Sequence, residues 1–119
     1  MKILFVKIAN MKNYQGISIN DVPIDCGSYV NDTGNAFEKY NFKPRLCQDG
    51  VERCFGFFET KHRNGVVVGN EKDGRNKLNI NKIEGCERLG NVDYVEDVLV
   101  VFCTKVRGTG TRVVGWYKH

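Results

Sequence analysis

The sequence predicts a small, mainly β protein with minor helix, and two observations carry this prediction. The first is a pair of apolar, mostly β-branched runs at residues 98–103 and 111–116, separated by a glycine-bearing loop. Two such runs joined in this way are typical of a β-hairpin. The second is a series of further short strand patterns and Gly-rich turns, with little helical period. Together they favour a small, partly closed β-barrel.

The hairpin organises the rest of the predicted fold. Its first run, 98–103, is apolar at every position, so we expect a central strand that is covered on both faces. Residues 2–9 form a strand at the start of the chain, and we expect Ile3 and Phe5 to pack inward.

Three segments between these strands have weaker patterns. Residues 54–60 are predicted as a strand in which Gly56 marks a bulge or a close approach of the backbone. Residues 78–83 alternate apolar and polar side chains with period two, which is typical of a half-buried strand. Residues 35–42 fit either a helical turn or a strand, and the proline at 44 ends this segment in both cases.

Residues 10–36 show no lasting helical or strand period. A loop region of this length in a compact domain is usually functional or disordered. Its tyrosines and turn-forming residues favour a functional loop, with Tyr14 near a tip.

Composition places the chain among ordinary soluble proteins of one domain, residues 1–119, with 41% hydrophobic and 27% charged residues. No apolar run approaches the ~18 residues of a membrane span, so we expect no membrane contact. The five cysteines are odd in number and irregular in spacing. This favours a reduced, cytoplasmic protein with neither metal nor cofactor, although a zinc site or a disulfide stays open as an alternative.

The net charge of +4 comes from the second half of the chain. Residues 1–59 carry seven Lys/Arg and seven Asp/Glu, whereas residues 60–119 carry eleven and seven. Basic side chains in loops beside strands can form a surface that faces phosphates. A solvated surface that favours lysine would give the same counts.

An enzymatic function has little support in the sequence. The two histidines, His62 and His119, stand in no nucleophile–base arrangement, and no phosphate-binding Gly-rich motif occurs. His62 with Lys61 and Arg63 could form an RNase-like acid–base cluster, which is the weaker alternative. A protein-interaction or oligomerisation module is a further alternative, and it would require an exposed apolar patch.

Several motifs carry a resemblance to known families. Residues 97–102 and 113–118 resemble the closing strands of PUA-like domains, a superfamily that includes the EVE, YTH, ASCH and SRA-type readers. Over most of the chain, the sequence more closely resembles an N-terminal domain of bacterial proteins that often carry a nuclease module, such as an HNH domain, further on. The segments that carry this second resemblance are 10–16, 27–30, 40–42, 54–57, 80–83 and 115–118.

The resemblance implies a reader of a modified base in DNA, which guides a linked nuclease and performs no catalysis itself. Such a reader extrudes the base at a free-energy cost of a few kcal/mol. Stacking on aromatic rings returns ~1–3 kcal/mol per base, and burying a methyl group adds about 0.8 kcal/mol.

Candidate side chains for this function follow from their chemistry. Rings that could stack the base are Tyr14, Tyr29, Phe57, Trp116 and Tyr117. Polar groups that could read its edge are Asn10, Ser28, Asn41 and Glu59. Cations that could hold phosphates are Lys61, Arg63, Arg75, Lys105, Arg107 and Arg112. Core packing of Phe57 or Trp116, and a turn role for Asn41, are the alternative interpretations.

Overall fold

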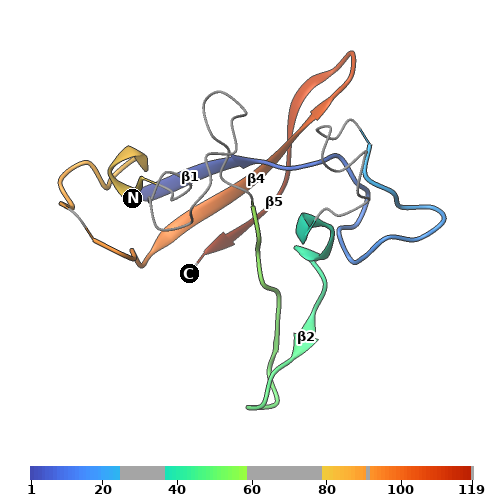
Figure 1. The fold of residues 1–119 in the computed structure, drawn as a ribbon, viewed down its shortest axis with the longest axis horizontal. Coiled ribbons are helices and arrows are strands. Elements are labelled where there is room, and N and C mark those ends of the chain that lie inside the picture. Colours follow the sequence, from blue (N-terminus) through green and yellow to red (C-terminus); the bar gives the residue numbers. More distant parts are fainter. Residues whose placement is uncertain (25–36, 59–78, 91, 119) are drawn as a thin grey trace, which may run out of the picture.

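A computed structural model describes residues 1–24, 37–58, 79–90 and 92–118 (Figure 1). In these residues the strands form two separate sheets, one of three strands and one of two, and the helices are short 3-10 turns. The prediction of a mainly β protein with minor helix is therefore confirmed. The described strands do not close into a barrel.

The main sheet has the strand order β1-β4-β5 and contains the predicted hairpin. Strand β4 (Val98–Val106) pairs in parallel with β1 (Lys2–Lys7) and antiparallel with β5 (Gly110–Lys118). The central position predicted for the apolar run 98–103 is confirmed, because β4 has a partner on each edge. Cover on both faces was also predicted; Phe102 packs in the core, whereas Val101 on the other face is buried between exposed Phe5 and Trp116.

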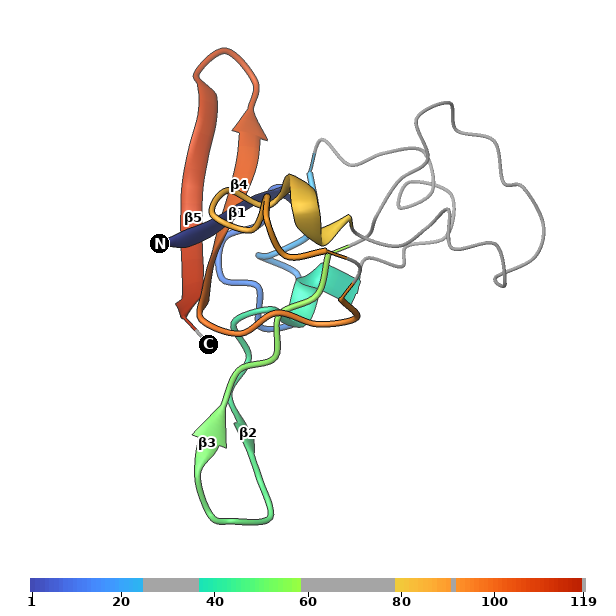
Figure 2. The ribbon, with the colours of Figure 1, turned by 90° about the vertical axis from the view of Figure 1, so that its left-hand side faces the viewer.

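One face of the main sheet carries the core. Alternation along β1 and β4 directs Val6 and Phe102 to this face, where they pack with Ile8, Met11 and Tyr14. In Figure 2, β4 and β5 run along one side of the molecule, and the short 3-10 helices η1 (Phe37–Tyr40) and η3 (Ile80–Lys82) lie to the right of them. In the described residues, η1 and η3 therefore lie on one side of the sheet.

Two glycines allow aromatic rings to pack closely on this covered face. A Cβ at Gly115 would lie 2.3 Å from the Phe42 ring, and one at Gly56 would lie 2.4 Å from the Tyr117 ring. Such distances exclude any side chain at either position without a shift of the rings. Of the two roles predicted for Gly56, the structure shows the close approach.

Two of the strand predictions are wrong. Residues 80–82 form η3 instead of a strand, because the Asn79 side chain accepts a hydrogen bond from the Asn81 N–H at 3.1 Å and caps a helical turn. Residues 54–58 form no strand, and the main chain of Phe57 bonds to the Asn41 side chain instead of to a neighbouring strand.

The inward packing predicted for Phe5 is also wrong. Leu4, Val6 and Ile8 occupy the alternate positions that face the core, so Phe5 points to the opposite face and is 63% exposed. Ile3 shares the outward parity of Phe5 and is partly buried.

The second sheet is a small hairpin that projects from the body of the molecule (Figures 1 and 2). It pairs β2 (Arg45–Leu46) with β3 (Glu52–Arg53). Helix η1 comes before this hairpin in the chain. Of the two structures predicted for the segment 35–42, η1 shows the helical turn, over residues 37–40.

The four cysteines of the described residues are free thiols. Within the same residues, no helix has the length and apolar character to cross a membrane.

Candidate functional site

An open hollow of about 380 Å³ lies between η1, the start of β2 and the segment 55–57 that follows β3. Among the described residues, its lining consists of four aromatic rings and two cations, with no carboxylate. The lining residues are Phe37, Tyr40, Lys43, Arg45, Phe55 and Phe57. We call this hollow the aromatic pocket.

The rings of the aromatic pocket are unusually accessible. Phe37 is 62% exposed, Phe55 59% and Phe57 42%. Phe37 and Phe57 meet edge to face, with ring centroids 5.5 Å apart. Aromatic side chains stabilise a fold when they are buried. A cluster of them that stays exposed is therefore typical of a binding surface.

Cations gather around the Tyr40 ring at one side of the pocket. Lys39 Nζ, Lys43 Nζ and the Arg45 guanidinium carbon lie 5.2, 5.7 and 5.9 Å from the ring centroid. These distances fall within the range of cation–π attraction. The pocket therefore joins stackable rings to a local positive charge.

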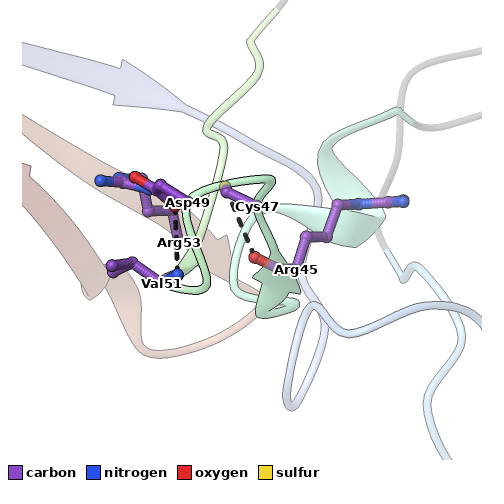
Figure 3. Close-up of polar contacts among 5 residues, drawn as sticks. All are labelled: Arg45, Cys47, Asp49, Val51 and Arg53. Atoms are coloured by element: carbon purple, nitrogen blue, oxygen red, sulfur yellow. Dashed lines mark hydrogen bonds and ion pairs between the residues drawn. The ribbon is translucent and has the colours of Figure 1, made fainter.

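Arg45 and Arg53 stand on the two strands of the same hairpin but have different partners. The Arg53 guanidinium forms an ion pair with Asp49 at 2.7 Å, and hydrogen bonds to Cys47 and Asp49 raise its pKa. Figure 3 shows the Arg45 side chain extending away from this pair. Among the described residues this is the one salt bridge, so no carboxylate there neutralises Arg45.

The Asn41 side chain fixes the main chain of Phe57, which is one of the residues that line the pocket. The side chain of Asn41 is fully buried, its Nδ2 donates to the Phe57 carbonyl at 2.9 Å, and its Oδ1 accepts from the Phe57 N–H at 2.8 Å. Both ends of the amide are thus used within the protein. The prediction that Asn41 reads a base edge is wrong, and its role is to position Phe57.

Two predicted pocket rings, Tyr14 and Tyr117, belong to the core. Tyr14 is 2% exposed, and its hydroxyl donates to the Ala9 carbonyl at 2.6 Å and accepts from the Met11 N–H at 3.2 Å. Burial raises its pKa. Tyr117 packs against Phe102, and its buried hydroxyl has no hydrogen-bond partner.

Trp116 lies on the other face of β5 from Tyr117, because neighbouring strand residues point to opposite faces. It is 65% exposed, so the interpretation of Trp116 as a core residue is wrong. It cannot share a pocket with Tyr117. Asn10 lies at the start of the loop that contains Tyr14, and its main chain pairs with that of Ile24.

Lys105, Arg107 and Arg112 are exposed at or beside the β4–β5 turn. In both ribbon views this turn lies at the top and the β2–β3 hairpin at the bottom, so these cations lie far from the hairpin (Figures 1 and 2). The remaining predicted site residues lie outside the described residues: Ser28, Tyr29, Glu59, Lys61, Arg63 and Arg75.

Of the predicted site residues that the structure describes, Phe57 alone lines the aromatic pocket. The sequence does contain a signal for the others: between residues 37 and 45, aromatic and basic side chains alternate closely. That interleaving is typical of nucleic-acid surfaces.

Comparisons with known proteins give no assignment, since no family model, curated protein or solved structure matches the chain. Within the described residues, no group of three or more His, Cys, Asp or Glu side chains is arranged to hold a metal ion. The geometry of the aromatic pocket therefore carries the functional argument.

Proposed function

We propose that the protein is a nucleic-acid-binding module that recognises a modified base in DNA, extruded from the duplex and held in the aromatic pocket. The observation that supports this proposal is the lining itself, which in the described part of the chain combines four exposed rings with Lys43 and Arg45 and includes no carboxylate. A nucleotide offers the matching groups, namely a planar base and an anionic phosphate.

The energetics of such a pocket are favourable. Extruding a base costs a few kcal/mol. Stacking contributes ~1–3 kcal/mol per base, so contact with two of the rings offsets the extrusion. A methyl group adds about 0.8 kcal/mol on burial, so discrimination also requires a close fit around the modified position.

The charges of the pocket narrow the class of ligand. An aromatic cage for a cation, such as a methylated lysine, gains from nearby negative charge, and the lining residues that the structure describes supply none. Lys43 and Arg45 donate hydrogen bonds and accept none. They would therefore contact phosphate oxygens or the acceptor edge of a base.

In this proposal the chain contributes binding, and a linked nuclease domain acts on the DNA that it holds. A reducing cytoplasm suits the free thiols of the described cysteines. A partly closed, PUA-like barrel is the architecture that we propose for the whole domain, with the three-stranded sheet as part of its wall.

The experiment is a binding screen against duplexes that carry unmodified, methylated or hydroxymethylated bases, each at several salt concentrations. We expect one modified duplex to bind more tightly at every salt concentration. Phe55→Ala, which truncates a 59% exposed ring, should abolish that preference while the protein stays folded. Equal affinity for modified and plain duplexes throughout the screen would contradict the proposal.

The β2–β3 hairpin supplies a matched pair of charge variants. Arg45→Gln should weaken binding to all duplexes and reduce the slope of log affinity against log salt by about 1. Arg53→Gln removes the same charge, but that charge is already paired with Asp49. If both variants lowered affinity equally, net charge rather than the pocket would explain the binding.

A further inference from the structure

The face of the main sheet opposite to the core carries a row of apolar side chains. Phe5 on β1 pairs with Val101 on β4, and Val101 pairs with Trp116 on β5. The two outer rings are 63% and 65% exposed, whereas Val101 between them is 8% exposed. We call this row the outer stripe.

Lysines surround the outer stripe on the same face. Lys7 on β1, Lys105 on β4 and Lys118 on β5 all have the outward parity of the stripe and are exposed. No Asp or Glu occurs anywhere in the three strands. The face is therefore apolar and aromatic at its centre and carries three lysines around it, with Glu84, which bridges to Ile3 at the edge of β1, as one acidic neighbour.

We propose that this face binds single-stranded nucleic acid, with one base on Phe5, one on Trp116, and the lysines on the phosphates. Phe5 and Trp116 lie on strands that are two interstrand spacings apart, so their positions on the sheet are separated by about 10 Å. Sheets that bind single strands use this arrangement, in which aromatic side chains on the sheet surface each stack a base. The lysines supply the charge that such binding requires.

A second copy of the chain fits this face poorly. A symmetric dimer through the outer stripe would bring the lysines of the two copies together, and no strand carboxylate would compensate them. A polyanion with planar groups satisfies both the rings and the charges.

This inference rests on the proposed function for its class of ligand, but it concerns a second surface. The outer stripe lies on the face of the sheet opposite to the core, whereas Gly56, between the pocket residues Phe55 and Phe57, packs against Tyr117 on the core face. Each surface can therefore be disabled without the other.

The protein carries its own reporter, because Trp116 is its only tryptophan. We expect an oligodeoxythymidylate to quench the intrinsic fluorescence with the same midpoint as an independent anisotropy titration. Heparin, a polyanion without bases, should bind the lysines without comparable quenching. Binding of the oligonucleotide without quenching, or equal quenching by heparin, would overturn the proposal.

Two variants separate the outer stripe from the aromatic pocket. Phe5→Ala should weaken oligonucleotide binding by roughly 5- to 150-fold, the range expected for loss of one stacked base. Phe55→Ala, in the pocket, should leave the affinity and the quenching unchanged. Loss of modified-duplex preference in Phe55→Ala with intact quenching would support both sites, whereas intact single-strand affinity in Phe5→Ala would refute the stripe alone.

Sedimentation of the same samples measures the mass of the protein and so tests whether a second copy of the chain occupies the outer stripe. We expect a monomer at all protein concentrations and no change in mass on Phe5→Ala. A dimer that Phe5→Ala dissociates would overturn the proposal in favour of a second copy.

Discussion

The two faces of the main sheet differ in what covers their aromatic side chains. On the covered face, Phe102 is 1% exposed and meets Phe42 and Tyr117 with ring centroids 5.8 and 5.3 Å away. On the opposite face, Phe5 and Trp116 are more than half exposed. On β5 the core ring of Tyr117 and the surface ring of Trp116 are neighbours, so a step of one residue separates them.

This difference teaches that the apolar pattern of these strands has two causes. Rings on the covered face stabilise the fold, because each removes apolar area from water. Phe5 and Trp116 on the opposite face leave most of their area in water and so contribute little to stability. We propose that a ligand covers them, and the same proposal applies to the rings of the aromatic pocket.

The largest expected effect tests the two faces directly. Phe102→Ala should lower the free energy of unfolding by about 3–5 kcal/mol, because it leaves a cavity among packed rings. Phe5→Ala should lower it by less than about 1 kcal/mol, since the ring is 63% exposed. Denaturant titrations of both variants measure the contrast. Similar losses in the two variants would show that Phe5 is covered.

The next effect concerns the support of the pocket. Asn41→Ala should lower the free energy of unfolding by about 2–3 kcal/mol, because it leaves the N–H and C=O of Phe57 without their partner. It should also weaken binding of the modified duplex, because Phe57 loses its position. Asn79→Ala is the control, since this exposed cap of η3 should cost only ~1 kcal/mol or less and leave binding unchanged.

A smaller effect distinguishes the two core tyrosines. Tyr14→Phe should lower the free energy of unfolding by about 1 kcal/mol, because its hydroxyl bonds to Ala9 and Met11. Tyr117→Phe should leave stability unchanged or raise it slightly, since its buried hydroxyl has no partner. Thermal unfolding of both variants gives the comparison. A clear loss in Tyr117→Phe would reveal a hydrogen bond to that hydroxyl.

The smallest effect is a change of stability in alkali. Burial raises the pKa of Tyr117 to about 12, against an unfolded value near 10. The folded state therefore keeps its proton over a range in which the unfolded state has lost it, so stability falls as pH rises from 10 to 12. Tyr14, whose pKa is also raised, adds to the same trend. Tyr117→Phe should reduce the fall, and an identical pH profile would contradict the assignment.

The sequence predicts the hairpin and its central strand well, because the apolar β-branched run at 98–103 has few alternatives. It predicts Phe5 on the wrong face, because residues 2–9 are apolar at both odd and even positions and so do not indicate which set faces the core. It misses η3, because the side chain of Asn79 turns a period-two pattern into a capped helical turn.

The candidate site was harder to predict than the strands. Tyr14 looks exposed in a polar sequence, but Asp21 accepts hydrogen bonds from the N–H groups of Lys12 and Asn13 and folds the loop over the core. The aromatic pocket depends on the contact of η1 with residues 55–57, which the Asn41–Phe57 bonds create. Contacts between segments so far apart in sequence leave no local pattern.

The central claim is that the aromatic pocket, and not the outer stripe, holds the modified base. The most direct measurement is the ratio of affinities for modified and plain duplexes in the unmutated protein, in Phe55→Ala and in Trp116→Ala. The account predicts that the ratio falls to about one in Phe55→Ala and is unchanged in Trp116→Ala, because Trp116 faces away from the core side of the sheet. A ratio that survives in Phe55→Ala and is lost in Trp116→Ala would contradict it.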